Sequence, residues 1–123
     1  MVAFTITLPW PDTRLTPNAK RRAHWSSYIK PAKLAKATAC AITLAAVGRH
    51  RFAVPPKVDI HFYPPDLRAR DDDGMVGAFK HARDGIADAI RHDDSTWTPE
   101  YHYHPPHRPD GRVVVVLTDG GAQ

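Results

Sequence analysis

The stretch RARDDDGMVGAFKHARDGIADAIRHDD, residues 68–94, decides the middle of the predicted fold. It opens on two arginines and three consecutive aspartates, and it closes on the acidic pair at 93–94. Between these groups, apolar residues recur at the spacing of an amphipathic helix. The sequence therefore predicts a helix over residues 73–91 whose buried face consists of Met75, Phe79, Ala82, Ile86, Ala89 and Ile90.

The acidic residues around this helix suggest a metal site. Adjacent carboxylates raise the cost of ionising one another, so a chain that clusters them usually holds a cation. Alternate residues of an extended segment point the same way, which lets Asp71 and Asp73 converge. Asp94 would join them if the fold brings the far end of the helix close. We expect these three residues to bind Mg²⁺, which prefers oxygen ligands.

Lys80 is the cation of the predicted helix that belongs with this site. Asp73, Lys80 and Asp84 fall at offsets of 0, 7 and 11 residues and share the polar face of a continuous helix. A lysine there would stabilise negative charge in a phosphoryl transition state. We therefore assign catalytic roles to Asp71, Asp73, Lys80 and Asp94. A purely structural role as turn and cap residues is the alternative, because Asp is common in turns.

The rest of the chain predicts four strands and a second helix. Strands are expected at 4–8, 54–63, 96–103 and 113–117, with a basic loop at 11–25 and a frayed tail from Asp119. A helix over 27–47 would bury Leu34, Ala41, Leu44 and Ala45. The order β-α-β-α-β-β indicates one α+β domain over residues 1–123, a small mixed β-sheet with two helices.

Charge is divided unevenly along the chain. The net charge is +4, and of the acidic residues only Asp12 precedes Asp59. The basic first half is typical of a surface that faces a polyanion, although a solvated basic face gives the same pattern. The candidate DNA-binding residues are Arg14, Lys20, Arg21, Arg22, Arg68 and Arg70.

Other site classes fit less well. The single cysteine, Cys40, excludes an internal disulfide and a cysteine-based zinc site. No signal peptide and no apolar run of bilayer length is visible, so we expect a cytoplasmic protein without membrane contact. His102, His104 and His107 form an alternative zinc cluster on a Pro-rich loop. The three tryptophans, Trp10, Trp25 and Trp97, could stack on bases or pack in the core.

These residues resemble the RusA family of Holliday-junction resolvases over most of the chain. The resemblance rests on residues 70–74, on Lys80, on 84–89 (DGIADA) and on Asp93-Asp94, with the opening ITLPWP of residues 6–11 as a further match. Asp71, Asp73 and Asp94 match the family's catalytic acids, and Lys80 matches its lysine. Gly74 stands where the family usually has Asn. The spacing from Asp73 to Lys80 is roughly one helical turn longer than in the family, which keeps the lysine on the same face of a helix.

The resemblance implies a RusA-like fold and a homodimer that resolves four-way DNA junctions by paired, symmetric, Mg²⁺-dependent nicks in recombination and repair. Many members are carried by phages or prophages. Two alternatives stay open at this point. One is a non-catalytic protein that binds branched DNA, and the other is a nuclease that acts on other branched or flapped DNA.

Overall fold

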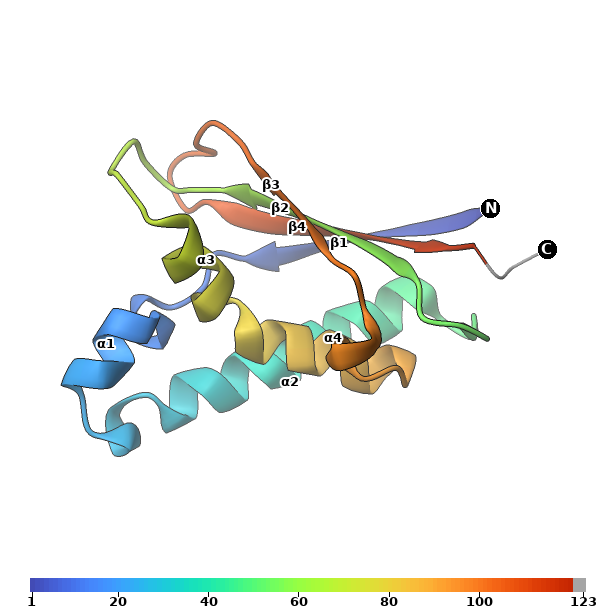
Figure 1. The fold of residues 1–123 in the computed structure, drawn as a ribbon, viewed down its shortest axis with the longest axis horizontal. Coiled ribbons are helices and arrows are strands. Elements are labelled where there is room, and N and C mark those ends of the chain that lie inside the picture. The colour runs from blue at the N-terminus through green and yellow to red at the C-terminus, as the bar shows by residue number, and fades with distance from the viewer. Residues whose placement is uncertain (121–123) are drawn as a thin grey trace.

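The computed structural model describes residues 1–120, and one four-stranded sheet organises them (Figure 1). The strands β1 (Val2–Pro9), β2 (Lys57–Tyr63), β3 (Glu100–Tyr103) and β4 (Arg112–Asp119) lie in the order β1-β4-β2-β3. β4 is antiparallel to both of its neighbours, whereas β2 and β3 are parallel. The predicted mixed sheet of an α+β domain is confirmed, and β3 is an edge strand.

All helices cover the same face of this sheet (Figure 1). After β1 come a 3₁₀ turn (Thr13–Leu15), the helix α1 (Pro17–Arg22), a second 3₁₀ turn (Trp25–Ser27) and then α2 (Ile29–Val47). The crossover from β2 to β3 contains α3 (Asp72–Ala78), α4 (Lys80–Ile90) and a 3₁₀ turn at Asp94–Thr96. Parallel strands need such a long connection, because a tight turn can join only antiparallel neighbours.

The core lies between the sheet and α2 and α4. Alternate residues of β2 and β4 are fully buried on the helix side: Val58, Ile60, Phe62, Val113, Val115 and Leu117. Phe79, Ile86 and Ile90 enter the same core from the helices. The period-two pattern of β2 is therefore confirmed. The core face of the second predicted helix is confirmed for Phe79, Ile86 and Ile90, whereas Met75 and Ala82 are only partly buried and Ala87, rather than Ala89, belongs to the core.

The buried stripe predicted for α2 is wrong. Leu34 and Leu44 are 68% and 49% exposed, and α2 instead buries Pro31, Ala39, Thr43 and Val47. The reason is the close approach of α4. A Cβ added at Gly85 would lie 2.2 Å from the backbone oxygen of Lys36, so this crossing accepts only small residues. Backbone proximity, not the largest apolar side chains, sets the orientation of α2.

The single helix predicted over 73–91 is divided at Phe79. The Phe79 amide donates to the carbonyls of both Met75 and Val76 at 3.2 Å, which tightens the last turn of α3. Two glycines, Gly74 and Gly77, weaken α3 further as a helix. Gly77 also lies against α1, since a Cβ there would meet Pro17 Cγ at 2.5 Å. The observed order is therefore β-α-α-β-α-α-β-β, with four helices where the predicted order β-α-β-α-β-β has two.

Three smaller predictions also need correction. The loop expected at 11–25 contains α1, which begins at a Pro and is capped by Thr16. The strand expected from residue 96 begins at Glu100. Asp119, predicted to start a frayed tail, ends β4 and accepts a 2.7 Å contact from His50. The rest of that predicted tail, residues 121–123, lies outside the described residues. None of the helices within residues 1–120 combines the length and apolar character needed to cross a bilayer.

Candidate active site

The predicted site residues Asp71 and Asp73 line a cleft of about 550 Å³. The cleft lies between the segment around α1 and the connection from β2 into α3. Its walls come from residues far apart in sequence: Trp10, Pro11, Thr13, Thr16, Pro17, Asn18, Arg21, Pro65, Asp66, Arg68, Arg70, Asp71, Asp73, Gly74, Met75 and Ala78. Three predicted DNA-binding arginines therefore share one concave surface with two predicted metal ligands.

The three aspartates have no protein cation to neutralise them. Asp71 is the N-cap residue of α3, and Asp72 and Asp73 lie in its first turn. All three are exposed, and within residues 1–120 their carboxylates make no hydrogen bond and no ion pair. Arg70, directly before them, instead binds Asp66 at 2.9 Å. Asp71, Asp72 and Asp73, the acidic segment, therefore form no ion pair with the arginines of the cleft within residues 1–120.

The three arginines of the cleft are held to different degrees. The Arg70 guanidinium lies over the Trp10 ring at 5.6 Å and donates to the carbonyls of Asp66 and Arg68, so it is fixed in place. Arg21 is exposed and donates to the side chain of Asn18. Arg68 is exposed too. Two exposed guanidinium groups and one held by Asp66 and Trp10 suit the binding of successive phosphates.

Asp94 does not join Asp71 and Asp73 in this structure. Of the described residues, only a different group brings three potential ligands within 4.8 Å of one another. Asp94 pairs with Arg83 at 3.5 Å, and Arg83 also donates to the Tyr101 hydroxyl at 2.7 Å. The predicted set of three ligands for one ion is therefore not assembled here, and the carboxylate of Asp94 is paired with Arg83 instead.

A row of side chains nevertheless connects the two acidic groups along β3. The charges of Asp72 and Asp73 contribute to a raised pKa of Tyr103, though burial is the larger cause. Tyr101 is two residues away on the same face of the strand, about 7 Å along it. Tyr101 then contacts Arg83, which holds Asp94. Both acidic groups therefore border one strip of the surface.

The acidic pair at the far end of this strip is electrostatically asymmetric. Burial raises the pKa of Asp94, and its neighbours Asp93 and Asp84 add to the rise against the opposing charge of Arg83. The pKa of Asp93 is lowered, mainly by the backbone amide of Ser95. Of the pair, Asp94 is the carboxyl that takes up a proton more readily.

Lys80 lies outside the cleft. It is the exposed first residue of α4, and its charge lowers the pKa of Lys20, although burial has the larger effect on that amine. Lys20 lies 2.6 Å from His81 Nε2, so the His81 ring accepts from the ammonium. Because the helix is divided at Phe79, the continuous helix assumed for Asp73 and Lys80 is not formed, and only Asp73 lines the cleft. The catalytic role of Lys80 stays a prediction.

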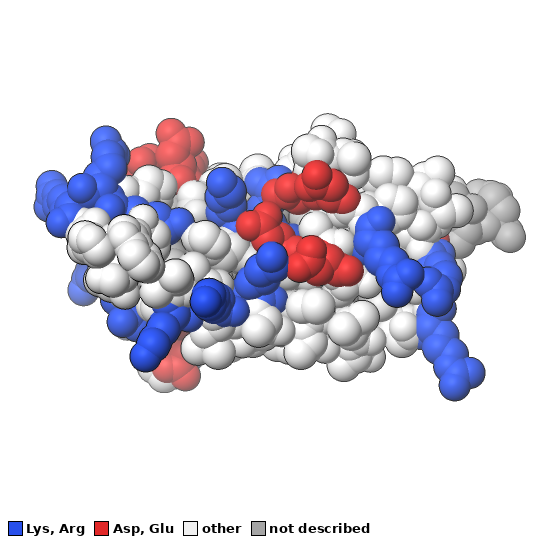
Figure 2. Space-filling model, turned by 90° about the horizontal axis from the view of Figure 1, so that it is seen from below, with Lys and Arg blue, Asp and Glu red and all other residues white. Residues whose placement is uncertain are grey.

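The remaining basic residues form the surroundings of the cleft. Arg14 is tied to Asp12 at 2.8 Å, and Arg22 is exposed in the last turn of α1. Seen from the helix side, Lys and Arg side chains gather at the end of the molecule that carries α1, and a separate acidic group lies near the middle (Figure 2). Lys and Arg side chains also lie beside this acidic group and at the opposite end of the same face, so the basic charge is spread over the face and is not confined to one end (Figure 2).

His81 gives a testable pH dependence. Burial and the charge of Lys20 lower its pKa below 6.5, and Lys80 and Lys36 lower the pKa further against the opposing charge of Asp84. The folded state therefore disfavours protonation, and the stabilisation present above pH 6.5 is lost as pH falls. One proton limits this loss to about 1.4 kcal/mol per pH unit, and solvent screening keeps it well below that.

We expect the free energy of unfolding to fall between pH 7 and pH 5.5, and to fall less steeply in His81→Gln. Urea unfolding at a series of pH values measures both slopes. His107→Gln is the matched control, since His107 is exposed in the loop before β4. Equal slopes for His81→Gln and the parent protein would show that His81 does not titrate as described.

The acidic segment fits Mg²⁺ by its donor chemistry. Magnesium is usually bound by one or two carboxylates together with substrate phosphates. Asp71 and Asp73 supply two carboxylates without competing partners, and the arginines beside them suit phosphate. Asp71 and Asp73 are thus the residues that could hold the ion.

Sequence reasoning missed several residues that the structure places beside the candidate site residues. Tyr101, Tyr103 and Arg83 border the acidic groups, yet they looked like ordinary strand and helix residues. On the other face of the sheet, His102 groups with Asp59 and Glu100, whereas the predicted zinc partner His107 lies on a loop. Acidic residues and histidines alternate with other residues in both KVDIHFY (57–63) and EYHYH (100–104). This shared alternation was the signal that could have predicted their grouping on one face of the sheet.

Of the three tryptophans, Trp10 lines the cleft, Trp25 is 57% exposed and Trp97 is 7% exposed. Trp97 is a core residue with its indole N–H on the His92 carbonyl at 3.2 Å. Trp10 packs edge-on against Phe62. Trp10 and Trp25 are therefore the two that a bound nucleic acid could contact.

Comparison with known proteins identifies a relative, but the description of that relative assigns it no activity. No family model matches the chain. A protein of Xylella fastidiosa, described as an uncharacterized protein, is 38% identical over 118 residues, which cover 93% of this chain and 75% of that protein. This degree of identity over nearly the whole domain shows that the chain belongs to the same family as the Xylella fastidiosa protein.

Proposed function

We propose that this protein is a Mg²⁺-dependent endodeoxyribonuclease that acts on branched DNA, with the four-way junction as its substrate. One observation carries the proposal. Asp71 and Asp73, whose carboxylates have no partner within residues 1–120, line the same cleft as Arg21, Arg68 and Arg70. The resemblance of residues 70–94 to the RusA family supports the same reading, and it supplies the expectation of a homodimer that makes paired nicks.

The chain's own residues would act by binding and positioning the DNA backbone. Asp71 and Asp73 would hold the metal, and Arg21 and Arg68 would contact phosphates on either side of the scissile bond. Arg70, fixed by Asp66 and Trp10, presents a preorganised charge to the phosphoryl oxygens. Bound Mg²⁺ supplies Lewis-acid activation of the phosphodiester and of the attacking water.

Asp94 and Lys80 enter the proposal in separate places. Asp94 has a raised pKa and lies at the end of the strip that Tyr101 and Tyr103 form with the acidic segment. We propose that Asp94 reaches the reacting phosphate only when DNA lies along this strip. Arg83 would then leave Asp94 and bind a phosphate of the DNA backbone. Lys80, next to Lys20, adds positive charge for a neighbouring DNA arm.

A substrate panel tests the proposal against its alternatives. Labelled four-way junction, flap, fork and linear duplex are incubated with the protein at one salt concentration, with Mg²⁺ or with EDTA. We expect nicks in the junction that require Mg²⁺. Tight junction binding without products would favour a non-catalytic binding protein, and preferential cutting of the flap or fork would favour a nuclease for other branched DNA.

The double variant Arg21→Ala/Arg68→Ala should bind junction DNA more weakly and with a smaller dependence on salt. Each lost phosphate contact lowers the slope of log K against log [salt] by about 0.9. Two lost contacts would therefore reduce the slope by about 1.8. Fluorescence anisotropy from low to moderate salt measures it.

Arg49→Ala is the control for this double variant. Arg49 is also exposed, but it follows α2 and is absent from the cleft. It should bind with nearly the parent slope. If both proteins lose the same fraction of the slope, binding depends on total charge and the cleft is not the DNA site.

A further inference from the structure

The face of the sheet opposite the helices carries a row of metal-binding side chain types. Asp59 and His61 alternate with the buried residues of β2, and Glu100 and His102 alternate with Tyr101 and Tyr103 on β3. The parallel register places Asp59 opposite Glu100 and His61 opposite His102. His104 follows His102 beyond the end of β3, and its amide donates to the Phe62 carbonyl at 3.0 Å. Side chains from positions some 40 residues apart therefore stand on one surface.

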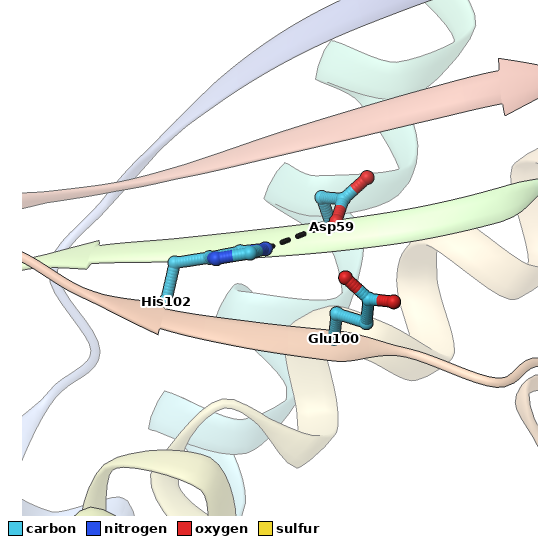
Figure 3. A group of neighbouring side chains, drawn as sticks. All are labelled: Asp59, Glu100 and His102. Carbon is cyan, nitrogen blue, oxygen red and sulfur yellow. Dashed lines mark hydrogen bonds and ion pairs between the residues drawn. The ribbon is translucent and has the colours of Figure 1, made fainter.

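Three of these side chains converge. One ligand atom each from Asp59, Glu100 and His102 lies within 4.8 Å of the other two. His102 Nε2 is 3.0 Å from Asp59 Oδ1, and the Glu100 carboxylate points toward this pair from the neighbouring strand (Figure 3). Ligands about 2.1 Å from a tetrahedral ion are roughly 3.4 Å apart, so small side-chain rotations would close the group around one ion.

The protein neutralises these carboxylates only weakly. Asp59 and Glu100 face each other across the strands, an unfavourable arrangement for like charges. Their shared partner is Lys57 Nζ, at 4.0 Å from Asp59 Oδ2 and 3.8 Å from Glu100 Oε2. Lys57 has a 57% exposed side chain, and exposed pairs of this length contribute little. A divalent cation could displace this lysine at small cost.

The neighbouring histidines orient the imidazole. His61 stacks on His102 with ring centroids 4.4 Å apart, and His61 Nδ1 lies 2.8 Å from His104 Nε2. The stacked ring of His61, held in turn by His104, therefore restricts the orientation of the His102 imidazole beside Asp59.

We propose that Asp59, Glu100 and His102 bind a divalent transition-metal ion, with Zn²⁺ as the ion to test. One imidazole and two carboxylates suit zinc and its neighbours better than Mg²⁺, which prefers oxygen ligands and water. The group shares no residue with the cleft. The ion would fasten the edge strand β3 to β2, and so hold the strand that carries Tyr101 and Tyr103.

Zinc titration of the purified protein, by calorimetry and by competition with a chromogenic chelator, tests this site. The parent protein should bind one Zn²⁺, and its melting temperature should rise with added Zn²⁺. His102→Ala and Asp59→Asn should each weaken the affinity by about 100-fold, since even outer-sphere residues contribute 10–100-fold. His107→Ala, on an exposed loop, should bind Zn²⁺ as the parent does.

The cleft variant Asp71→Asn/Asp73→Asn separates this proposal from the nuclease proposal, because it should keep full Zn²⁺ affinity while losing cleavage. Far-UV circular dichroism checks that each variant is folded. If His102→Ala does not fold, His102→Gln replaces it in the Zn²⁺ titration. The site is refuted if the parent binds no Zn²⁺, if a folded His102 variant binds it equally well, or if only the cleft variant loses it.

Discussion

Asp73→Asn should cut four-way junctions about 10²–10³-fold more slowly than the parent protein, the loss typical of removing one preorganised charge-stabilising group. Asp73 lines the cleft with Arg21, Arg68 and Arg70, and its carboxylate has no protein partner among the described residues. The amide is nearly the same size but carries no charge for Mg²⁺. Junction binding should persist, because the arginines that contact phosphate are unchanged.

The measurement is single-turnover cleavage of a labelled junction with anisotropy binding under matched salt. Asp110→Asn is the control, since Asp110 is an exposed aspartate in the loop between β3 and β4 and lies outside the cleft. It should cut at the parent rate. Cleavage by Asp73→Asn at the rate of Asp110→Asn would remove Asp73 from the reaction centre.

Gly85→Ala should destabilise the fold by about 3 kcal/mol, the upper part of the usual range for overpacking. An added Cβ would lie 2.2 Å from the Lys36 carbonyl oxygen and 3.0 Å from the Cys40 nitrogen. Both are backbone atoms of α2, so the contact cannot be relieved by rotating a side chain. α2 and α4 would have to separate, which opens the core around Ala39 and Ile86.

Gly74→Ala is the matched control for this prediction, as it makes the same chemical change inside α3. Its added Cβ would meet only Asp71 Cβ, at 3.8 Å, an ordinary contact. Alanine is the better helix former, so this variant should gain about 0.5–1 kcal/mol. Urea denaturation measures both variants. A stabilising effect of Gly85→Ala would contradict the described crossing of α2 and α4.

The strands were more predictable than the helices for a physical reason. One buried face gives β2 an alternation that the sequence shows directly, and β4, covered on both edges by other strands, is a near-continuous apolar run. The orientation of α2 was not predictable from apolar residues, because Gly85 brings its backbone against α4 and leaves Leu34 and Leu44 outside. The break at Phe79 depends equally on tertiary contacts, including Pro17 against Gly77.

The site was predictable only where it is local in sequence. Asp71 and Asp73 were chosen from adjacent residues, and they do share a cleft with Arg68 and Arg70. The position of Asp94 relative to Asp71 and Asp73 depends on how α4 and β3 pack in the fold, which the spacing of residues in the sequence does not show. In the same way, the histidine cluster was expected from neighbours on one loop, whereas the partner of His102 is Asp59 on another strand. The parallel pairing of β2 and β3 creates that contact.

Mapping of cleavage products on a mobile four-way junction tests the central proposal most directly. The parent protein is incubated with the junction labelled on each strand in turn, with Mg²⁺ and with EDTA. We expect nicks at matching positions in two opposed strands, in the Mg²⁺ reactions alone. Intact strands after saturating, Mg²⁺-containing incubation of fully bound junction would contradict the assignment of this cleft as a phosphodiester-cutting site.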